Sequence, residues 1–132
     1  MPHFHDVQHE LAGPYRELGT LLPDVVASYA ALHKASMSDG ALSSKTKELI
    51  ALAIAITREC DGCIASHARG AARRGATVDE VAETVGVTVL MNGGPGTVWG
   101  PRALAAFHEW ADAPVPPGSG SGEEARGGPA PR

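Results

Sequence analysis

The sequence predicts an all-α fold, a compact helical domain of about six helices. Two observations carry this prediction: apolar residues recur at helical spacing, and no stretch alternates apolar and polar residues between hairpin turns. The 22 alanines are a third sign, because small side chains allow helices to approach closely.

Start and stop signals divide the chain into these helices. Pro23 is a typical first helical residue, Ser43 or Ser44 is a typical cap, and Thr77-Val-Asp-Glu80 has the pattern of a capping box. The segment 49–56, Leu-Ile-Ala-Leu-Ala-Ile-Ala-Ile, is apolar on every face and is therefore expected to be the buried middle of the fold. The expected helices cover residues 6–18, 23 to about 36–40, 44–58, 60–75, 78–91 and a last segment after Gly96 that contains Leu104, Phe107 and Trp110.

Composition excludes several classes of protein. With 15 acidic and 11 basic residues the formal charge is -4, and aromatic residues make up 5%, which disfavours a nucleic-acid surface. The longest apolar run, 49–56, is far shorter than a membrane span, and the first residues lack the pattern of a secretory signal, so we expect a cytoplasmic protein with no membrane partner. Residues 113–132 hold five prolines and five glycines and are predicted to be a flexible tail after one helical domain, 1–112.

The chain has two cysteines, at positions 60 and 63 of Cys60-Asp-Gly-Cys63. Cysteines this close cannot link distant segments, so the pair is not a disulfide framework. Their spacing lets both sulfurs meet at the start of a helix, where unpaired backbone N–H groups favour a thiolate. Helix-terminus reasoning alone favours Cys60 as the more exposed and more reactive thiol. Two buried cysteines that act as small apolar side chains are the alternative.

Two further residues are candidates for proton transfer. His67 follows Cys63 by four residues, so its imidazole and the thiol share one helix face. Glu48 lies on an otherwise apolar helix face, where a carboxylate needs a partner. If the helices on either side of Glu59 form an antiparallel hairpin, Glu48 is about 16 Å and His67 about 12 Å from the turn, which lets them face each other. The alternatives are a solvated Glu48 and a His67 bonded to a carbonyl.

These four residues stand at fixed spacings: Glu48, eleven residues, Cys60-x-x-Cys63, three residues, His67. The segment K-E-L-I-A-L-A-I-A-I-T-R-E-C-D-G-C-I-A-S-H resembles the core of the carboxymuconolactone decarboxylase superfamily, in its AhpD-like alkylhydroperoxidase branch, where the same spacings occur. The segments G-A-x-x-x-E-V-A-E-T-V and G-G-P-G extend the resemblance over roughly residues 20–110.

The resemblance implies a thiol peroxidase, an oxidoreductase with peroxiredoxin-like activity. In such an enzyme Cys63 attacks the hydroperoxide, Cys60 resolves the sulfenic acid to a disulfide, and Glu48 and His67 relay protons. It implies no cofactor beyond the redox-active Cys60–Cys63 disulfide, a dithiol reductant such as a lipoyl or thioredoxin-like protein, and a homo-oligomer, trimeric or hexameric. Gly62 stands where the alkylhydroperoxidase has a second histidine, so one proton carrier is missing. The true decarboxylases lack the C-x-x-C pair, which disfavours decarboxylation here.

Other functions fit the same residues. Cys60, Cys63, His67 and Glu48 have the donor atoms of a tetrahedral zinc site, and a redox-sensing module without turnover would keep the same dithiol. A second, weaker metal candidate is the group His3, His5 and His9 near the amino terminus.

Overall fold

The computed structural model describes residues 3–113, which form six α-helices. They are α1 (His3–Leu21), α2 (Pro23–Met37), α3 (Ser44–Thr57), α4 (Asp61–Arg73), α5 (Val78–Asn92) and α6 (Gly94–Ala111). The predicted all-α fold is confirmed, and no β-strand occurs between residues 3 and 113. The first helix is longer than expected at both ends, and the last begins at Gly94 rather than after Gly96. Residues 114–132 of the predicted tail lie outside the described residues.

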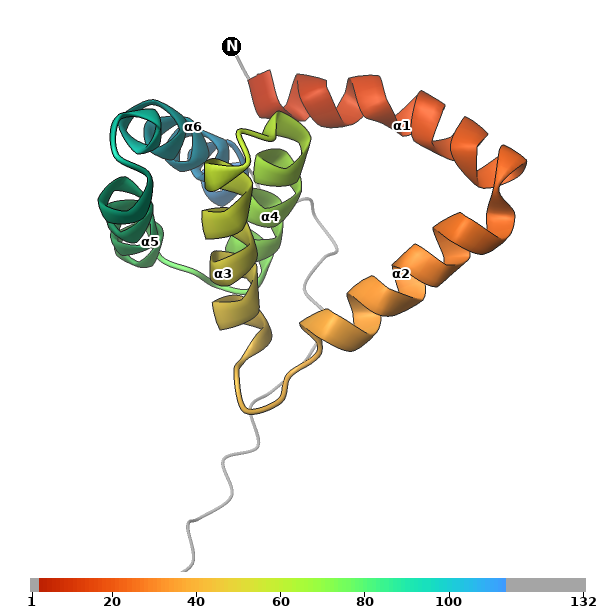
Figure 1. Cartoon of the computed structure of the whole chain (residues 1–132), viewed down its shortest axis with the longest axis horizontal. Coiled ribbons are helices and arrows are strands. Elements are labelled where there is room, and N and C mark those ends of the chain that lie inside the picture. The colour runs from red at the N-terminus through yellow and green to blue at the C-terminus, as the bar shows by residue number, and fades with distance from the viewer. Residues whose placement is uncertain (1–2, 114–132) are drawn as a thin grey trace, which may run out of the picture.

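Helices α3 to α6 pack into one body (Figure 1), whose centre lies between α3, α4 and α6. Burying a large apolar side chain stabilises a fold by about 1.5–3 kcal/mol, and small residues let the helices come close enough to do so. The buried apolar residues are Phe4, Leu52, Ala55, Ile56, Ile64, Ala65, Ala68, Ala71, Val81, Ala103, Ala106 and Phe107. Four of these twelve lie on α4, the helix that begins beside the cysteine pair.

The centre of α3 is not buried on every face, so that expectation was wrong. Leu52 and Ile56 are buried, but Ile50 and Ile54, on the opposite face, are 45% and 54% exposed. One apolar face of α3 therefore packs in the core, and the other apolar face is exposed on the surface of the body. Residues Val87, Leu90 and Met91 of α5 are also exposed, which gives the body a second set of uncovered apolar side chains.

A tight turn joins α3 to α4. Glu59 takes a left-handed conformation, with φ of 54°. Its amide donates to the carbonyl of Ile56 at 3.1 Å, and the amide of Cys60 donates to the carbonyl of Ala55 at 3.2 Å. These are the two hydrogen bonds of a Schellman motif, which closes a helix and redirects the chain. Cys60 thereby becomes the N-cap of α4, and α3 and α4 form the predicted antiparallel hairpin (Figure 1).

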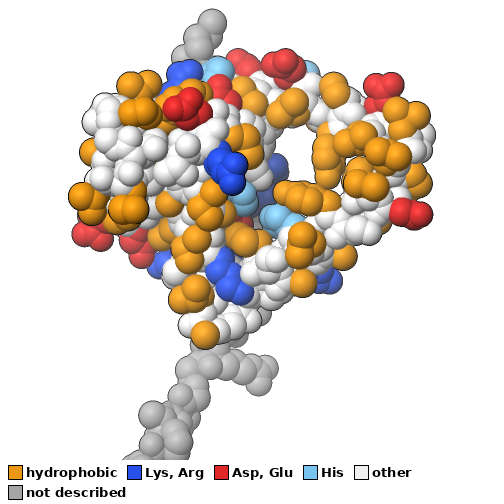
Figure 2. Space-filling model, in the orientation of Figure 1, with side chains coloured by type: hydrophobic (Ala, Val, Ile, Leu, Met, Phe, Trp, Pro, Cys, Tyr) orange, Lys and Arg blue, Asp and Glu red, His pale blue; other side chains and the backbone are white. Residues whose placement is uncertain are grey.

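Helices α1 and α2 form an arm that stands away from the body (Figure 1). The first turn of α1 is anchored, because the amides of Phe4 and His5 donate to the Glu109 carboxylate at 3.0–3.1 Å. Beyond it α1 runs outward, and α2 returns to contact α3. Figure 2 shows an opening between arm and body, with apolar side chains along the arm. The large apolar side chains of the arm that are more than about a third exposed are Leu11, Tyr15, Leu18, Leu21, Leu22, Val25, Tyr29 and Leu32.

The predicted capping box at the start of α5 is confirmed. The Thr77 hydroxyl accepts from the amide of Glu80 at 3.1 Å, and the Glu80 carboxylate accepts from the amide of Thr77 at 2.8 Å. Lys45 of α3 also donates to Glu80, at 2.9 Å. These bonds to Lys45 and Thr77 lower the pKa of the Glu80 carboxyl, so the Lys45 bond ties α5 to α3 most firmly when that carboxyl is ionised. Within residues 3–113, no helix combines the length and apolarity that a membrane span needs.

Candidate active site

Glu48 and His67 face each other across the α3–α4 hairpin, as the sequence predicts. The Oε2 atom of Glu48 lies 2.8 Å from Nδ1 of His67. The Glu48 residue is only 6% exposed, so its carboxylate meets the imidazole largely away from water. The alternative of a solvated first-turn glutamate is wrong, because the antiparallel hairpin turns this face of α3 toward α4.

The pairing sets which nitrogen of His67 is available for chemistry. An ionised carboxylate can only accept hydrogen bonds, so Nδ1–H of the imidazole donates to Glu48. The other nitrogen, Nε2, is then the one that can take up or release a proton. The Glu48–His67 pair therefore has the chemistry of a proton acceptor held in one orientation.

Gly70 makes room for this pair. It lies three residues after His67 on α4, and a Cβ atom built on it would overlap the carboxyl group of Glu48. The Glu48 carboxyl thus rests directly on the backbone of α4, in a space that any other residue at position 70 would fill. The absence of a side chain at this position is a structural requirement of the pair.

The two cysteines form a disulfide at the start of α4. Cys60 caps the helix, and its sulfur accepts from the amide of Cys63 at 3.2 Å. Cys60 is half-buried and Cys63 is exposed, so the expectation that Cys60 is the more exposed of the two was wrong. The reason is the turn: Cys60 follows Glu59 into the hairpin, whereas Cys63 lies within the first turn of α4 on a face open to solvent.

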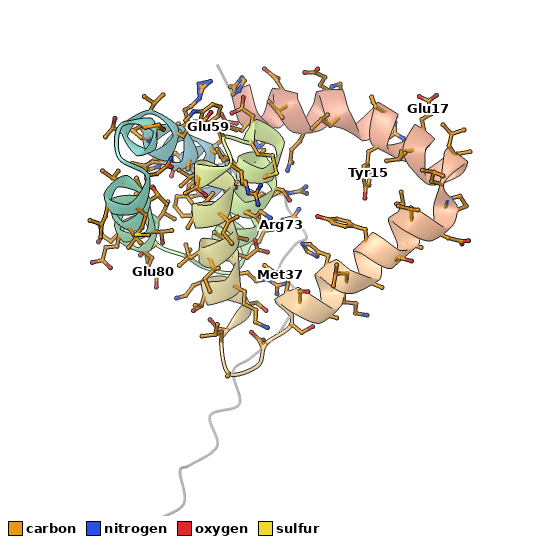
Figure 3. All side chains as sticks on the ribbon, viewed as in Figure 1. Tyr15, Glu17, Met37, Glu59, Arg73 and Glu80 are labelled. Carbon is orange, nitrogen blue, oxygen red and sulfur yellow. A yellow bond between two sulfur atoms is a disulfide. The ribbon has the colours of Figure 1, made fainter. Side chains whose placement is uncertain are left out.

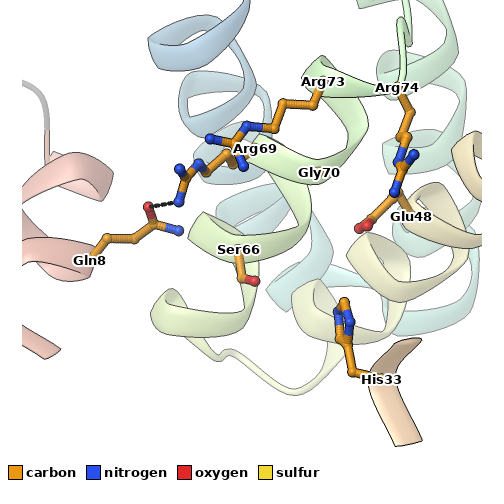
Figure 4. Close-up of a pocket in the computed structure, with 8 residues that line it drawn as sticks. All are labelled: Gln8, His33, Glu48, Ser66, Arg69, Gly70, Arg73 and Arg74. Atoms are coloured by element: carbon orange, nitrogen blue, oxygen red, sulfur yellow. Dashed lines mark hydrogen bonds between the residues drawn. The ribbon is translucent and has the colours of Figure 1, made fainter. Parts of the chain in front are cut away.

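A cavity of about 390 Å³ adjoins Glu48 (Figure 4). It lies between the α3–α4 hairpin and the arm, and its lining residues are Gln8, His33, Glu48, Ser66, Arg69, Gly70, Arg73 and Arg74. His33 comes from α2 and stacks on His67, with ring centroids 6.5 Å apart. Sequence reasoning missed His33 because it belongs to another helix, at no fixed spacing from the C-x-x-C motif. It also missed the arginines, of which Arg73 and Arg74 have the ordinary position of cations at a helix C-terminus.

The structure does not bring metal ligands together in the part of the chain that it describes. Among residues 3–113, no three His, Cys, Asp or Glu side chains are arranged to hold an ion. The four residues of the zinc alternative are partnered with one another, as a disulfide and as a hydrogen-bonded pair. Two of the three histidines of the weaker candidate, His3, His5 and His9, also have separate partners: His3 bonds Asp61 at 3.2 Å, and His5 lies 3.8 Å from Glu109.

Comparison with known proteins places these features in a family. The family model described as "Carboxymuconolactone decarboxylase family" matches residues 23–110. An uncharacterized protein of Cupriavidus necator is 36% identical over 98 residues, covering 74% of this chain and 87% of that protein. "Uncharacterized protein 4 in cox locus" of Paracoccus denitrificans is 39% identical over 82 residues, covering 62% of this chain and 74% of that protein.

A solved structure agrees with this assignment. It is the apo form of a carboxymuconolactone decarboxylase family protein from Legionella pneumophila, which is 34% identical to this chain with a TM-score of 0.82. The match covers 84% of this chain and 99% of that one. The helical fold and the sequence of residues 23–110 thus lead to the same conclusion: the chain belongs to the carboxymuconolactone decarboxylase family.

Proposed function

We propose that this protein is a thiol-dependent peroxidase of the AhpD-like type, which reduces hydroperoxides through a Cys60–Cys63 dithiol/disulfide cycle. The single observation that carries the proposal is the hydrogen-bonded Glu48–His67 pair on the same hairpin as the disulfide. A peroxidase needs a thiolate and a source of protons, and this hairpin carries both kinds of group.

The proposed cycle has three balanced steps. The Cys63 thiolate attacks the outer oxygen of the hydroperoxide, the O–O bond breaks, and with one proton the products are a sulfenic acid on Cys63 and an alcohol. The Cys60 thiol then attacks the Cys63 sulfur, which forms the disulfide and releases water. A dithiol reductant, such as a lipoyl or thioredoxin-like protein, exchanges with the disulfide and leaves oxidised.

Each protein group has one role in this cycle. Cys63 is the nucleophile, in keeping with its exposure, and Cys60 is the resolving thiol beside it. His67 accepts the thiol proton and returns one to the leaving oxygen, while Glu48 orients the ring through its hydrogen bond to Nδ1. No cofactor is needed beyond the two thiols. A dithiol that must be reduced for each turnover also suits the cytoplasm, which is the location that we propose.

A peroxidase assay tests the proposal. The full chain is reduced and supplied with hydrogen peroxide, tert-butyl hydroperoxide or cumene hydroperoxide, and with glutathione, a thioredoxin or a dihydrolipoyl donor. We expect a dithiol donor to support many turnovers, with one donor oxidised for each hydroperoxide consumed. A redox-sensing module would form the disulfide once and stop, and that result with every donor would contradict the proposal.

We further propose that the protein is a homo-oligomer, a trimer or a hexamer. The apolar side chains of the arm support this, because exposed apolar surface of that extent is typical of a contact with another chain. Sedimentation at micromolar concentration should show a species of three or six chains. Replacing Leu32 by Lys should shift it toward the monomer, whereas a 13.6 kDa monomer of the unaltered protein would contradict the proposal.

A further inference from the structure

The side chain of His33 is held against the α3–α4 hairpin by bonds between the end of α2 and the start of α3. The Ser44 hydroxyl donates to the carbonyl of Met37 at 2.8 Å, and the Ser44 amide donates to the Asp39 carboxylate at 2.6 Å. Figure 3 shows Met37 where α2 returns to the body, whereas Tyr15 points from α1 into the space between the arm and the body. His33 lies about one helical turn before Met37, so this junction fixes its position.

The ring of His33 stacks on the ring of His67, with centroids 6.5 Å apart and planes that differ by 16°. Nδ1 of His67 is occupied by Glu48, at 2.8 Å, whereas His33 bonds to no other residue between positions 3 and 113. A direct hydrogen bond needs about 2.7–3.2 Å between its two heavy atoms, so rings stacked at this separation can exchange a proton only through a bridging water. Two ring nitrogens without a partner in the described part of the chain therefore lie next to His67.

Two cavities meet at His33. The first is the cavity of about 390 Å³ beside Glu48, and the second, of about 480 Å³, lies toward the start of α3. Both are lined by His33, Glu48 and Arg74, and Figure 4 shows His33 pointing from α2 toward Glu48. The other residues that line the second cavity are Lys34, Met37, Ser38, Asp39 and Ser44. Charged and hydroxyl side chains prevail among them, so this space suits water.

The route from solvent to His33 is separate from the apolar surface of the arm. None of the exposed large apolar side chains of α1 and α2 lines the second cavity. His33 is itself exposed, and its contact with His67 lies within one chain. This arrangement is therefore compatible with a homo-oligomer in which another copy covers the apolar side chains of the arm.

The proposed cycle requires a proton to return to His67 in every turnover. Reduction by the donor dithiol releases both cysteines as thiolates, and the two protons of the donor go to the solvent. The next hydroperoxide needs two protons to leave as an alcohol and water, and one of them passes through His67. Between the two cysteines no side chain is available to bring it, because Asp61 is bonded to His3 at 3.2 Å and Gly62 has no side chain.

We propose that His33 carries protons between the solvent and His67. His33 takes up a proton from the solvent and passes it through a bridging water to Nε2 of His67. From there the proton reaches the Cys63 sulfur and, in the next turnover, the leaving oxygen. Both rings then return to their starting state, so protons and charge balance. His33 acts through His67 and does not touch the hydroperoxide. This role rests on the proposed peroxidase function, whereas the contact between the two rings does not.

Two substitutions of His33 separate proton transfer from stacking. His33→Phe keeps an aromatic ring against His67 but cannot carry a proton, and His33→Ala removes the ring. The assay uses the full chain with tert-butyl hydroperoxide and saturating dithiothreitol. A general acid or base contributes about 10²–10⁴-fold, and we expect a smaller fall in kcat, at least about tenfold, because His33 acts through another residue. The KM for the hydroperoxide should stay within about twofold, since His33 does not bind it.

Added imidazole supplies a readout that a purely structural role would not give. Millimolar imidazole should restore much of the kcat that His33→Ala loses, because a free ring can enter the vacated space and carry the proton. It should not raise the kcat of the unaltered protein. His108→Phe is the matched control: it makes the same change at an exposed histidine of α6 and should leave kcat unchanged.

The results distinguish this inference from the proposed function. Turnover by the unaltered protein together with full kcat in His33→Phe would overturn the inference alone, and would leave stacking as the role of His33. A fall in kcat that imidazole does not restore in His33→Ala would also overturn it, because the lost contact would then be a sufficient cause. An unaltered protein that consumes no hydroperoxide with any donor would overturn both.

Discussion

Cys63→Ser should abolish hydroperoxide consumption, with a fall in kcat/KM of at least about a thousandfold, because a serine hydroxyl is not ionised at neutral pH. Cys60→Ser should react with hydroperoxide once and stop, because its sulfenic acid on Cys63 finds no second thiol. The measurement is stopped-flow peroxide consumption, followed by mass spectrometry after treatment with a sulfenic-acid trap such as dimedone. We expect one adduct on Cys63 in the Cys60→Ser protein and none in the Cys63→Ser protein.

Both variants are needed because the structure offers an argument for each of the two sulfurs as the nucleophile. Cys63 is the more exposed, but the sulfur of Cys60 accepts from the Cys63 amide, a contact that favours a thiolate at Cys60. An adduct on Cys60 in the Cys63→Ser protein would exchange the two roles and keep the cycle. Full turnover by both variants would exclude the dithiol mechanism. Ser66→Ala, one turn after Cys63 on α4, is the matched control and should retain the activity.

The candidate site was predictable from the sequence where it depends on local spacing. The distances from Glu48 and His67 to the turn at Glu59 follow from the rise of an α-helix, and Thr77 with Glu80 identifies its own helix start. The hydrogen bond between Glu48 and His67 confirms the predicted hairpin geometry. Local rules were sufficient because two adjacent helices with a short connection have few ways to pack.

What the sequence could not predict depends on contacts between distant segments. His33 reaches His67 only because the arm returns α2 to the body, and no spacing rule relates residues of two helices separated by a third segment. The exposure of Ile50 and Ile54 was missed for a similar reason. Apolar periodicity shows that a face avoids water, but it does not distinguish a core from a surface that another chain covers.

Glu48→Gln should lower peroxidase kcat by about a hundredfold or more, because the amide keeps the shape but replaces the charged acceptor of the His67 Nδ1–H bond with a neutral one. Gly70→Ala should lower it comparably, since the new methyl group would occupy the place of the Glu48 carboxyl and displace it from His67. The displaced group is the end of a flexible side chain, so the fold should persist. Loss of a buried hydrogen bond to a charged group lowers the free energy of unfolding by about 1.5–3 kcal/mol. The higher helix propensity of Ala relative to Gly restores about 0.5–1 kcal/mol of it.

The matched control for Gly70→Ala is Gly86→Ala, in the middle of α5, where no atom lies within 4 Å of the added methyl group. It makes the same chemical change in a helix, so it should raise stability slightly and leave both kcat and the His67 signals unchanged. Nitrogen NMR of the imidazole supplies the structural readout: in Gly70→Ala the Nδ1 signal should lose the shift of a hydrogen bond to a carboxylate. A Gly70→Ala protein that loses this shift and keeps full kcat would show that the Glu48–His67 pair is not the proton relay. If displacement of the Glu48 carboxyl is the cause, the loss of activity and the change in the Nδ1 signal must occur together. Loss of activity with an unchanged Nδ1 signal would therefore assign Gly70 a role apart from that pair.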